Sequence, residues 1–362
     1  MVDAEQRVKE ITEELHKTKR NKATEHHIGS LLARRAQLQR DVMERKSRKI
    51  VGGGFDVKKQ GDATVVMLGF PSVGKSTLLT KLTNAKSKIA AYEFTTLECI
   101  PGIMEYKSAK IQLLDIPGII EGAQDGKGRG REVLSVARKA DLIMILLAVP
   151  RMNDYNMIMK ELWDVGVRLG ERPPNVDMKK EIRGGVSIIT ARKLTRISRQ
   201  EIIAIMNQYG MHNATITIKE DITPEQLIDV LEKNRVYINK VVVVNKVDLN
   251  GGKVPPGYPP GSVGICAEKG IGLEEVREKM YEGLKFMRVY TKTRTAGVNM
   301  DEPMMLRQGD TVRKFVSFLP RDFRNNFRYA LIWGKSVKFP GQRMGLDHVL
   351  MEGDVLHVIK KG

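Results

Sequence analysis

The chain has 362 residues and a formal net charge of +18, with 41% hydrophobic and 29% charged residues. This length predicts two to three domains, because one hydrophobic core seldom grows past about 250–300 residues, and the composition excludes wholesale disorder. No apolar run reaches the roughly 18–20 residues of a membrane span, the charged N-terminus does not match a secretory signal, and two cysteines cannot form a disulfide framework. We expect a cytoplasmic protein with no membrane association and no cysteine–histidine metal site.

The excess positive charge is concentrated at the two ends of the chain. Residues 1–50 carry 13 Lys/Arg against 8 Asp/Glu, and residues 285–362 carry 15 against 7. The 234 residues between them carry 33 against 28. Such ends are either solvated faces or binding sites for a polyanion, where Lys and Arg gain from counterion release.

Two helices are predicted at the N-terminus, over residues 3–20 and 24–48, because apolar residues recur at helical spacing between charged ones. Asn21 and Gly29 are the expected breaks. The prediction is a basic helical arm over residues 1–50, followed by a glycine linker at residues 52–54.

From residue 63 onward, short apolar strands alternate with helices. This pattern predicts a mostly parallel sheet covered on both faces, in a domain made of residues 60–172 and 240–287. The expected strands are 64–68, 111–115, 142–149, 241–245 and 262–266, and the expected helices are 76–82, 155–169 and 273–287.

Residues 173–239 interrupt this domain and are too many for a loop, so they predict an inserted α+β domain. Its expected strands are 186–190 and 215–218. Ser198 is the expected N-cap of a helix over 198–208, with Glu201 at the capping-box position, and Thr223-Pro224 opens a second helix.

The last part of the chain, residues 288–362, is predicted to be a small β-rich domain. Its expected strands are 311–318, 329–333 and 355–359, which Gly and Pro residues separate.

The segment from Gly69 to Ser76 matches GxxxxGK[ST] and lies between a strand and a helix, as this phosphate-binding motif requires. Backbone N–H groups of such a loop surround phosphates, Lys75 reaches the β- and γ-phosphates, and Ser76 ligates Mg²⁺. The predicted phosphate-binding residues here are Gly69, Pro71, Ser72, Val73, Gly74, Lys75, Ser76 and Thr77.

Two further segments complete the phosphate side of the predicted site. Asp115 ends a strand and begins a DxxG sequence; its carboxylate can hold Mg²⁺ through water, and the N–H of Gly118 can approach the γ-phosphate. The segment Tyr92–Thr96 lies between these motifs and offers a threonine hydroxyl to the Mg²⁺ shell.

The sequence from Asn245 to Asp248 reads NKxD and follows a strand. A carboxylate at Asp248 accepts from the N1–H and 2-amino group of guanine, a donor pair that adenine lacks. Asn245 can tie this loop to the phosphate loop, and Lys246 can cover the ring. A later segment, Cys266, Ala267 and Glu268, follows the next strand, and the Ala267 N–H is expected to face guanine O6.

These five segments, in this order, predict a GTP-binding and GTP-hydrolysing protein. GFPSVGKSTLL, YEFTTL, DIPGIIEGA and GKGRGRE resemble the Obg-type GTPases. Over essentially the whole chain, the order of domains resembles the developmentally regulated GTP-binding (DRG) family, in a compact archaeal-like form.

The resemblance implies a helix-turn-helix-like arm, a P-loop GTPase domain, an insertion like ribosomal S5 domain 2, and a C-terminal β-grasp (TGS) domain associated with RNA and ribosomes. It also implies that Thr96 is the magnesium-sensing threonine.

No catalytic residue is assigned, because Ile119 stands where many GTPases place a water-orienting Gln. We expect slow intrinsic turnover that depends on a reoriented switch, an ion or a protein activator. Some related GTPases hold K⁺ with an Asn of the phosphate loop, and Ser72 at that position weighs against K⁺. Glycines between residues 118 and 130 predict a nucleotide-gated switch, with a static loop as the alternative.

In the terminal domain, basic residues accompany aromatic ones, a combination that suits RNA or, alternatively, a solvated face over core aromatics. These residues are Arg321, Phe323, Arg324, Phe327, Arg328 and Tyr329. The predicted function is a GTP/GDP switch that engages ribosomes or structured RNA, with a further protein partner as activator or stabiliser.

Two other functions remain open from the sequence. One is an Obg-like ATPase, against which the intact Asp248 argues. The other is a nucleotide-gated RNA- or ribosome-binding adaptor with vestigial hydrolysis, which Ile119 allows.

Overall fold

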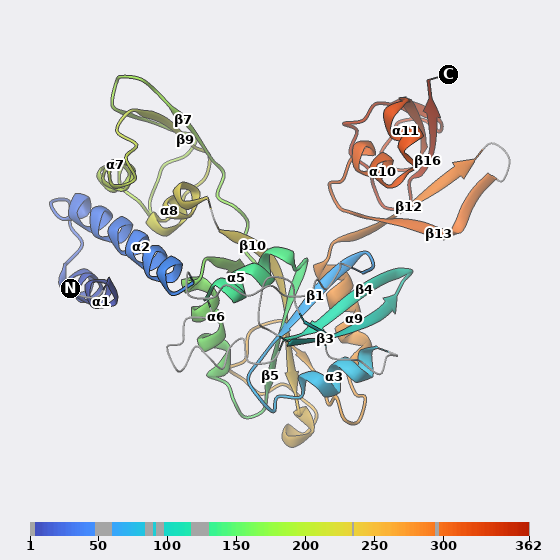
Figure 1. The fold of residues 1–362 in the computed structure, drawn as a ribbon, viewed down its shortest axis with the longest axis horizontal. Helices are drawn as coiled ribbons and strands as arrows, with labels where there is room; N and C mark the ends of the chain where they lie inside the picture. Colours follow the sequence, from blue (N-terminus) through green and yellow to red (C-terminus); the bar gives the residue numbers. More distant parts are fainter. Residues whose placement is uncertain are drawn as a thin grey trace.

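The computed structural model describes residues 4–47, 60–83, 90–91, 98–116, 130–233, 235–293 and 297–361. These residues form three sheets, of eight, five and three strands (Figure 1). Each sheet has its own cluster of buried apolar side chains. No helix among the described residues is long and apolar enough to cross a membrane.

The largest sheet has the order β11-β10-β5-β1-β4-β3-β2, with β6 paired to β10. Helices α3 and α9 contact each other, as do α5 and α6 (Figure 1). The strands are β1 (Ala63–Leu68), β2 (Ala90–Ala91), β3 (Glu98–Tyr106), β4 (Ala109–Asp115), β5 (Leu142–Ala148), β6 (Val167–Leu169), β10 (Val236–Asn245) and β11 (Val263–Gly264). The helices are α3 (Lys75–Leu82), α5 (Gly130–Lys139), α6 (Asp154–Asp164), the 3-10 turn η1 (Val247–Asn250) and α9 (Leu273–Gly283).

The mostly parallel sheet expected from the apolar strands is confirmed. Strand β1 pairs in parallel with β4 and β5, and β10 pairs in parallel with β5 and β11, whereas β3 runs antiparallel to β4. Strands β1 and β5 are buried along their whole length, which explains their continuous apolar sequence.

Two helices are shorter than the sequence predicted. The helix expected over 155–169 ends at Asp164, because Gly166 adopts a left-handed φ of 92° and turns the chain into β6. The helix expected over 273–287 ends at Gly283, and Phe286 already begins the next strand. In both cases the next strand begins with apolar residues that happen to continue the helical spacing, which made the predicted helix too long.

The inserted segment forms a three-stranded sheet in the order β7-β9-β8. Its elements are β7 (Val176–Lys180), β8 (Val186–Thr190), α7 (Arg199–Gln208), β9 (Ala214–Ile218) and α8 (Pro224–Glu232). Helix α7 begins with the capping box expected at Ser198. Helix α8 begins at the expected Thr223-Pro224, where Thr223 also forms a capping box that the sequence did not predict. The sequence did not predict β7, whose side chains are half-buried or exposed and largely charged.

The N-terminal helices α1 (Ala4–Lys17) and α2 (Glu25–Ser47) form the expected hairpin, but Gly29 does not break it. Gly29 lies inside α2, where a Cβ would come within 3.0 Å of the Cα and carbonyl oxygen of Glu201. The glycine therefore permits close packing of α2 on α7. Ala33, one turn further along, is wholly buried in the core of the insertion.

Gly29→Val is expected to lower the free energy of unfolding by about 2 kcal/mol, because the new side chain meets backbone that cannot move aside. Thermal unfolding of the full chain measures the loss. Gln39→Val, at an exposed position of the same helix, is the control that introduces valine into α2 without placing it against α7. Equal effects of the two substitutions would contradict the close packing.

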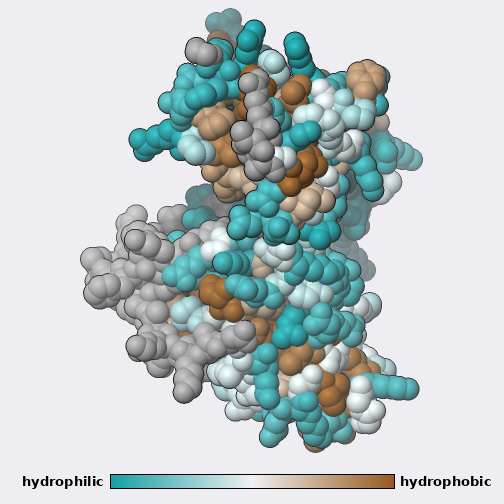
Figure 2. All heavy atoms as spheres, turned by 90° about the vertical axis from the view of Figure 1, so that its right-hand side faces the viewer, coloured by the Kyte–Doolittle hydropathy of each residue, from teal (hydrophilic) through white to brown (hydrophobic). Residues whose placement is uncertain are grey.

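The C-terminal sheet has the order β13-β12-β16-β14-β15. Its elements are β12 (Phe286–Thr293), β13 (Gly297–Arg307), α10 (Val312–Phe318), α11 (Arg321–Asn325), β14 (Phe327–Trp333), β15 (Gln342–Met344) and β16 (Val355–Lys360). On the side shown in Figure 2, apolar residues of this domain, in the upper half of the view, stand among hydrophilic ones.

The strand predicted over 311–318 is wrong, since this segment is helix α10. Its buried residues are Val312, Phe315 and Val316, which have helical rather than alternating spacing. The high content of β-branched and aromatic residues favoured a strand, but packing of one helical face determined the structure. The strands expected over 329–333 and 355–359 are confirmed as β14 and β16.

Candidate functional site

The predicted nucleotide motifs meet at one edge of the large sheet. The phosphate-loop motif follows β1, Asp115 ends β4, and Asn245 ends β10. These three strands are parallel neighbours of one another or of β5. Their carboxyl ends therefore lie together, where open α/β sheets bind ligands.

The loop between β1 and α3 depends on its glycines. Gly74 has a left-handed φ of 97°, and a Cβ at this position would lie 2.3 Å from Nδ2 of Asn245. At Gly69 a Cβ would lie 2.5 Å from the carbonyl oxygen of Leu146 on β5. Ser72 also has a positive φ, of 63°, which costs strain for a residue with a side chain. The loop is thus held close to both neighbouring strands.

Lys75, at the first turn of α3, folds over the loop that precedes it. Its Nζ donates hydrogen bonds to the carbonyl oxygens of Gly69 at 2.8 Å and Phe70 at 3.1 Å. The loop therefore places a cation at its own centre and at a helix N-terminus, where anions are favoured.

The Ser76 hydroxyl donates a 2.9 Å hydrogen bond to Oδ2 of Asp115. The carboxylate is only 2% exposed, and its other oxygen, Oδ1, is buried with no hydrogen-bond partner among the described residues. Burial raises the pKa of Asp115, while the Ser76 hydrogen bond and the Lys75 charge oppose this shift. A hydroxyl beside a carboxylate with a free oxygen matches the oxygen ligands of a hard divalent cation.

Two other predicted residues of this segment lie at the surface. Pro71 in the loop and Thr77 in α3 are exposed. Among the described residues, no group of three or more His, Cys, Asp or Glu side chains is placed to hold a metal by itself. A cation at Ser76 and Asp115 would need further ligands from nucleotide, water or the predicted Thr96 hydroxyl.

Asn245 joins three segments that are distant in sequence, as expected for its link to the phosphate loop. Its Nδ2 donates to the carbonyl oxygen of Val73 at 2.8 Å. Its Oδ1 accepts from the N–H groups of Lys246 at 2.8 Å and Ala267 at 3.0 Å. The Ala267 N–H, expected to face a base, is therefore already bonded to Asn245, because the amide oxygen lies within reach of both backbone donors.

Lys246 also contacts the phosphate loop, through a 3.0 Å hydrogen bond from Nζ to the carbonyl oxygen of Ser72. Asp248 is exposed at the start of η1, and Lys269 donates to its Oδ2 at 3.0 Å. Hydrogen bonds from Lys269 and then Cys266 lower the pKa of Asp248, which keeps it a pure acceptor at neutral pH. Lys269 is not among the residues predicted from the sequence.

The segment after β11 is built around Cys266. This residue is buried and exchanges two backbone hydrogen bonds with Ile271, at 3.1 Å each. The Cys266 thiol lies close enough to Asp248 to help lower the pKa of that carboxyl. Glu268 points to solvent.

Three predicted residues, Thr96, Gly118 and Ile119, lie outside the described residues. The same holds for most of the glycine-rich stretch between them and α5. Their positions relative to Ser76 and Asp115 therefore remain predictions.

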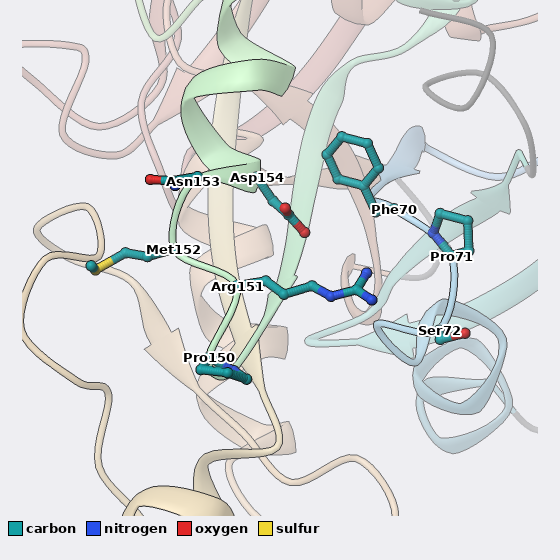
Figure 3. Close-up of a pocket in the computed structure, with 8 residues that line it drawn as sticks. All are labelled: Phe70, Pro71, Ser72, Pro150, Arg151, Met152, Asn153 and Asp154. Atoms are coloured by element: carbon teal, nitrogen blue, oxygen red, sulfur yellow. The ribbon is translucent and has the colours of Figure 1, made fainter. Parts of the chain in front are cut away.

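A cavity of about 690 Å³ adjoins the phosphate loop (Figure 3). The side chain of Arg151 extends across it toward Ser72, and Asp154 projects from the start of α6. Desolvation raises the pKa of Asp154, and its Oδ2 is buried with no hydrogen-bond partner in the part of the chain that the structure describes. The lining residues are Phe70, Pro71, Ser72, Pro150, Arg151, Met152, Asn153 and Asp154.

Arg151 and Asp154 are not among the residues predicted from the sequence. The available signal was their position just after β5, since ligands bind outside the carboxyl ends of such strands.

Three family models match the chain. Residues 64–180 match the 50S ribosome-binding GTPase family, residues 183–286 match the C-terminal region of that domain, and residues 287–360 match the TGS domain.

Relatives align over almost the whole chain. A GTP-binding protein of Methanocaldococcus jannaschii is 49% identical, over 99% of this chain and 93% of its own length. Developmentally-regulated G-protein 3 of Arabidopsis thaliana is 43% identical, over 98% of both chains. Among solved structures, the YchF GTPase of Schizosaccharomyces pombe is similar over 86% of this chain and all of its own, with 14% identity and a TM-score of 0.44.

Proposed function

The chain belongs to the developmentally regulated GTP-binding protein family and is a GTP-binding, GTP-hydrolysing switch, and we propose that it acts on ribosomes or structured RNA. The observation that supports nucleotide binding is that Lys75, the hydrogen-bonded pair Ser76 and Asp115, and Asn245 come together at one edge of the sheet. Hydrogen bonds there connect the segments that we propose bind the phosphates, the metal and the base.

For the nucleotide, we assign the phosphates to the loop and the base to the segments joined by Asn245. Lys75 would exchange its two loop carbonyls for β- and γ-phosphate oxygens. Asp248 would receive the guanine donors, and Lys246 would lie along the ring. Asn245 holds the two halves in register, because it binds Val73 on one side and Ala267 on the other.

GTPases of this kind use a nucleotide-associated metal, and the residues present fit Mg²⁺. Ser76 and Asp115 would hold it, directly or through water, and the buried Oδ1 of Asp115 would gain the partner it lacks. When bound, Mg²⁺ neutralises charge that develops on the phosphates. Ser76 and Asp115 would hold the ion next to the Lys75 ammonium, so that both positive charges act on the phosphates. Thr96 would add a hydroxyl ligand.

Asp115→Asn is expected to raise the melting temperature of the nucleotide-free protein at pH 7 while lowering Mg²⁺-dependent hydrolysis at least about tenfold. A carboxyl whose folded-state pKa is raised binds protons more tightly when folded, so it costs stability as pH rises through its pKa. The stability gain should therefore disappear near pH 4. Thermal unfolding at both pH values and phosphate release measure the two effects.

Glu105→Gln removes an exposed carboxylate from the neighbouring strand and is the control. Equal melting temperatures of Asp115→Asn and wild type at pH 7 would contradict the cost of the buried charge.

Hydrolysis without a water-orienting Gln is proposed to be slow and to depend on an activating protein or a stabilising partner. With Ile119 after the DxxG sequence, the chain itself supplies no group there to orient water. K⁺ remains a candidate activator despite Ser72, and turnover in K⁺ against Na⁺ buffers tests it directly.

We divide the chain into a basic arm (1–50), a GTPase domain (60–172 and 240–287), an insertion resembling ribosomal S5 domain 2 (173–239), and a TGS-like β-grasp domain (288–362). The ribosome or RNA role is supported by the description of the matched family, a 50S ribosome-binding GTPase, and by the excess charge of the terminal domain. Such a role would place the protein in the cytoplasm.

Co-sedimentation with ribosomes tests this role in three states: GDP, a GTP analogue and no nucleotide. We expect the GTP analogue to favour binding and a salt series to weaken it, as phosphate contacts require. Binding that ignores both nucleotide and salt would overturn the proposal.

A further inference from the structure

The terminal sheet has one face that its own core does not cover. Along β14, Ala330 and Ile332 are buried, and the alternate residues Tyr329, Leu331 and Trp333 are half-buried. Because side chains alternate across a strand, these three occupy the opposite face. None of them packs against the apolar core of the domain, which includes Phe315 of α10.

Neighbouring strands extend this outer face. Register pairs Tyr329 with Ile359, Leu331 with His357 and Trp333 with Val355. On the other side of β14, Leu331 is paired with Arg343 of β15. Directly paired residues point to the same side, so the outer face carries aromatic, aliphatic and basic groups together.

Two cations lie over the aromatic rings of this face. Lys292 Nζ is 4.3 Å from the centre of the Trp333 ring, and the Arg343 guanidinium is 4.9 Å from that of Tyr329. Within the described part of the chain, neither cation forms an ion pair with a carboxylate. The nearby Glu352 is bound to Arg288, and Asp354 is fully buried.

We propose that this outer face, centred on Trp333 and Tyr329, binds unpaired bases of single-stranded RNA. Aromatic rings stack on bases of any sequence, while Lys292 and Arg343 supply the positive charge that follows the backbone. Base-paired RNA does not expose its base faces, so the site selects unpaired segments. The proposal rests on the proposed RNA or ribosome role and names the surface that performs it.

The residues expected from the sequence are only partly those of this face. Phe327 packs against the core, and Phe323 lies on α11 under Lys360. Arg321 and Arg324 are in the same short helix. Of that set, Tyr329 belongs to the face, with Arg328 5.9 Å from its ring.

The test uses the full chain and a fluorescein-labelled 12-nucleotide oligouridylate, with a fully paired hairpin as the second probe. Anisotropy should show that Trp333→Ala and Arg343→Gln each weaken oligouridylate binding about tenfold, with a smaller effect on the hairpin. Arg343→Gln changes an exposed side chain and should not affect folding. It therefore still tests the proposal if Trp333→Ala unfolds.

Tryptophan fluorescence gives a direct readout of stacking, because the chain has only two tryptophans. The other, Trp163, lies against Arg168 in the GTPase domain. In a Trp163→Phe background, oligouridylate should quench the remaining emission from Trp333.

Matched controls come from the same domain. Phe339→Ala removes an aromatic side chain that is 62% exposed, and Lys314→Gln removes an exposed cation. Both variants should bind oligouridylate like the wild type.

Three outcomes are decisive. Unchanged oligouridylate binding by Trp333→Ala and Arg343→Gln overturns the proposal, and so does Trp333 emission that stays unquenched at saturation. Both results are those expected if the face binds a protein instead of RNA. If ribosomes still co-sediment, the ribosome role survives that result. A wild-type protein that binds neither ribosomes nor RNA refutes both.

Discussion

Lys75→Ala is expected to weaken GTP and GDP binding at least about a hundredfold and to abolish measurable turnover. The lysine Nζ lies 2.8 and 3.1 Å from two carbonyl oxygens of its own loop, so it stands at the loop centre before nucleotide enters. Charge-assisted hydrogen bonds contribute about 1.5–3 kcal/mol each, and alanine removes both phosphate contacts of this cation. Titration with a fluorescent GDP derivative and a phosphate-release assay measure the two losses.

Lys81→Ala is the matched control, since Lys81 is an exposed lysine in the last turn of the same helix. Lys81→Ala should keep the wild-type melting temperature without nucleotide. Binding by Lys75→Ala is measured below the variant's own melting temperature, because Lys75 donates to carbonyl oxygens of the buried residues Gly69 and Phe70. Tight GDP binding by Lys75→Ala would contradict the assignment of the phosphates to this loop.

The parallel sheet could be predicted because its strands are buried on both faces and therefore wholly apolar, as in β1 and β5. The starts of the two insertion helices could also be predicted, because Ser198 and Thr223 are residue types that favour the N-cap position. Helix α10 could not be recognised from local propensity, because its valines and phenylalanines also suit a strand. Only burial of one helical face decides between the two.

In the candidate site, too, local patterns could be predicted and contacts between distant segments could not. Motif spacing located Lys75, Asp115 and Asn245, because each motif follows a recognisable strand. Contacts between loops lie beyond this reasoning: Lys269 reaches Asp248 across 21 positions, and the Ala267 N–H is taken by Asn245. Such pairings depend on the final path of the backbone, which no local pattern encodes.

Part of the positive charge of the N-terminal arm has a structural role. Arg20 binds both carboxylate oxygens of Glu201, whose side chain is wholly buried, at 2.7 and 2.9 Å. Arg40 approaches the equally buried Glu232 at 4.0 Å. Part of the arm's positive charge therefore holds it on the insertion, and the terminal domain becomes the stronger candidate for RNA contact.

Asp248→Asn is expected to reduce GDP affinity about a thousandfold or more, because an amide NH₂ would face the N1–H and 2-amino donors of guanine. Xanthine replaces the 2-amino group with an oxygen, so the variant should prefer XDP to GDP. Lys269 and Cys266 lower the pKa of Asp248, which keeps the wild-type acceptor charged across the neutral range.

Competition of GDP, XDP and ATP against a labelled guanine nucleotide measures the preference, with wild type and variant side by side. Asp322→Asn is the control, because Asp322 is another exposed aspartate bound to a lysine, Lys360, but lies in the terminal domain. Strong displacement by ATP from the wild type would favour the ATPase alternative. Retention of GDP selectivity by Asp248→Asn would show that Asp248 does not read the base.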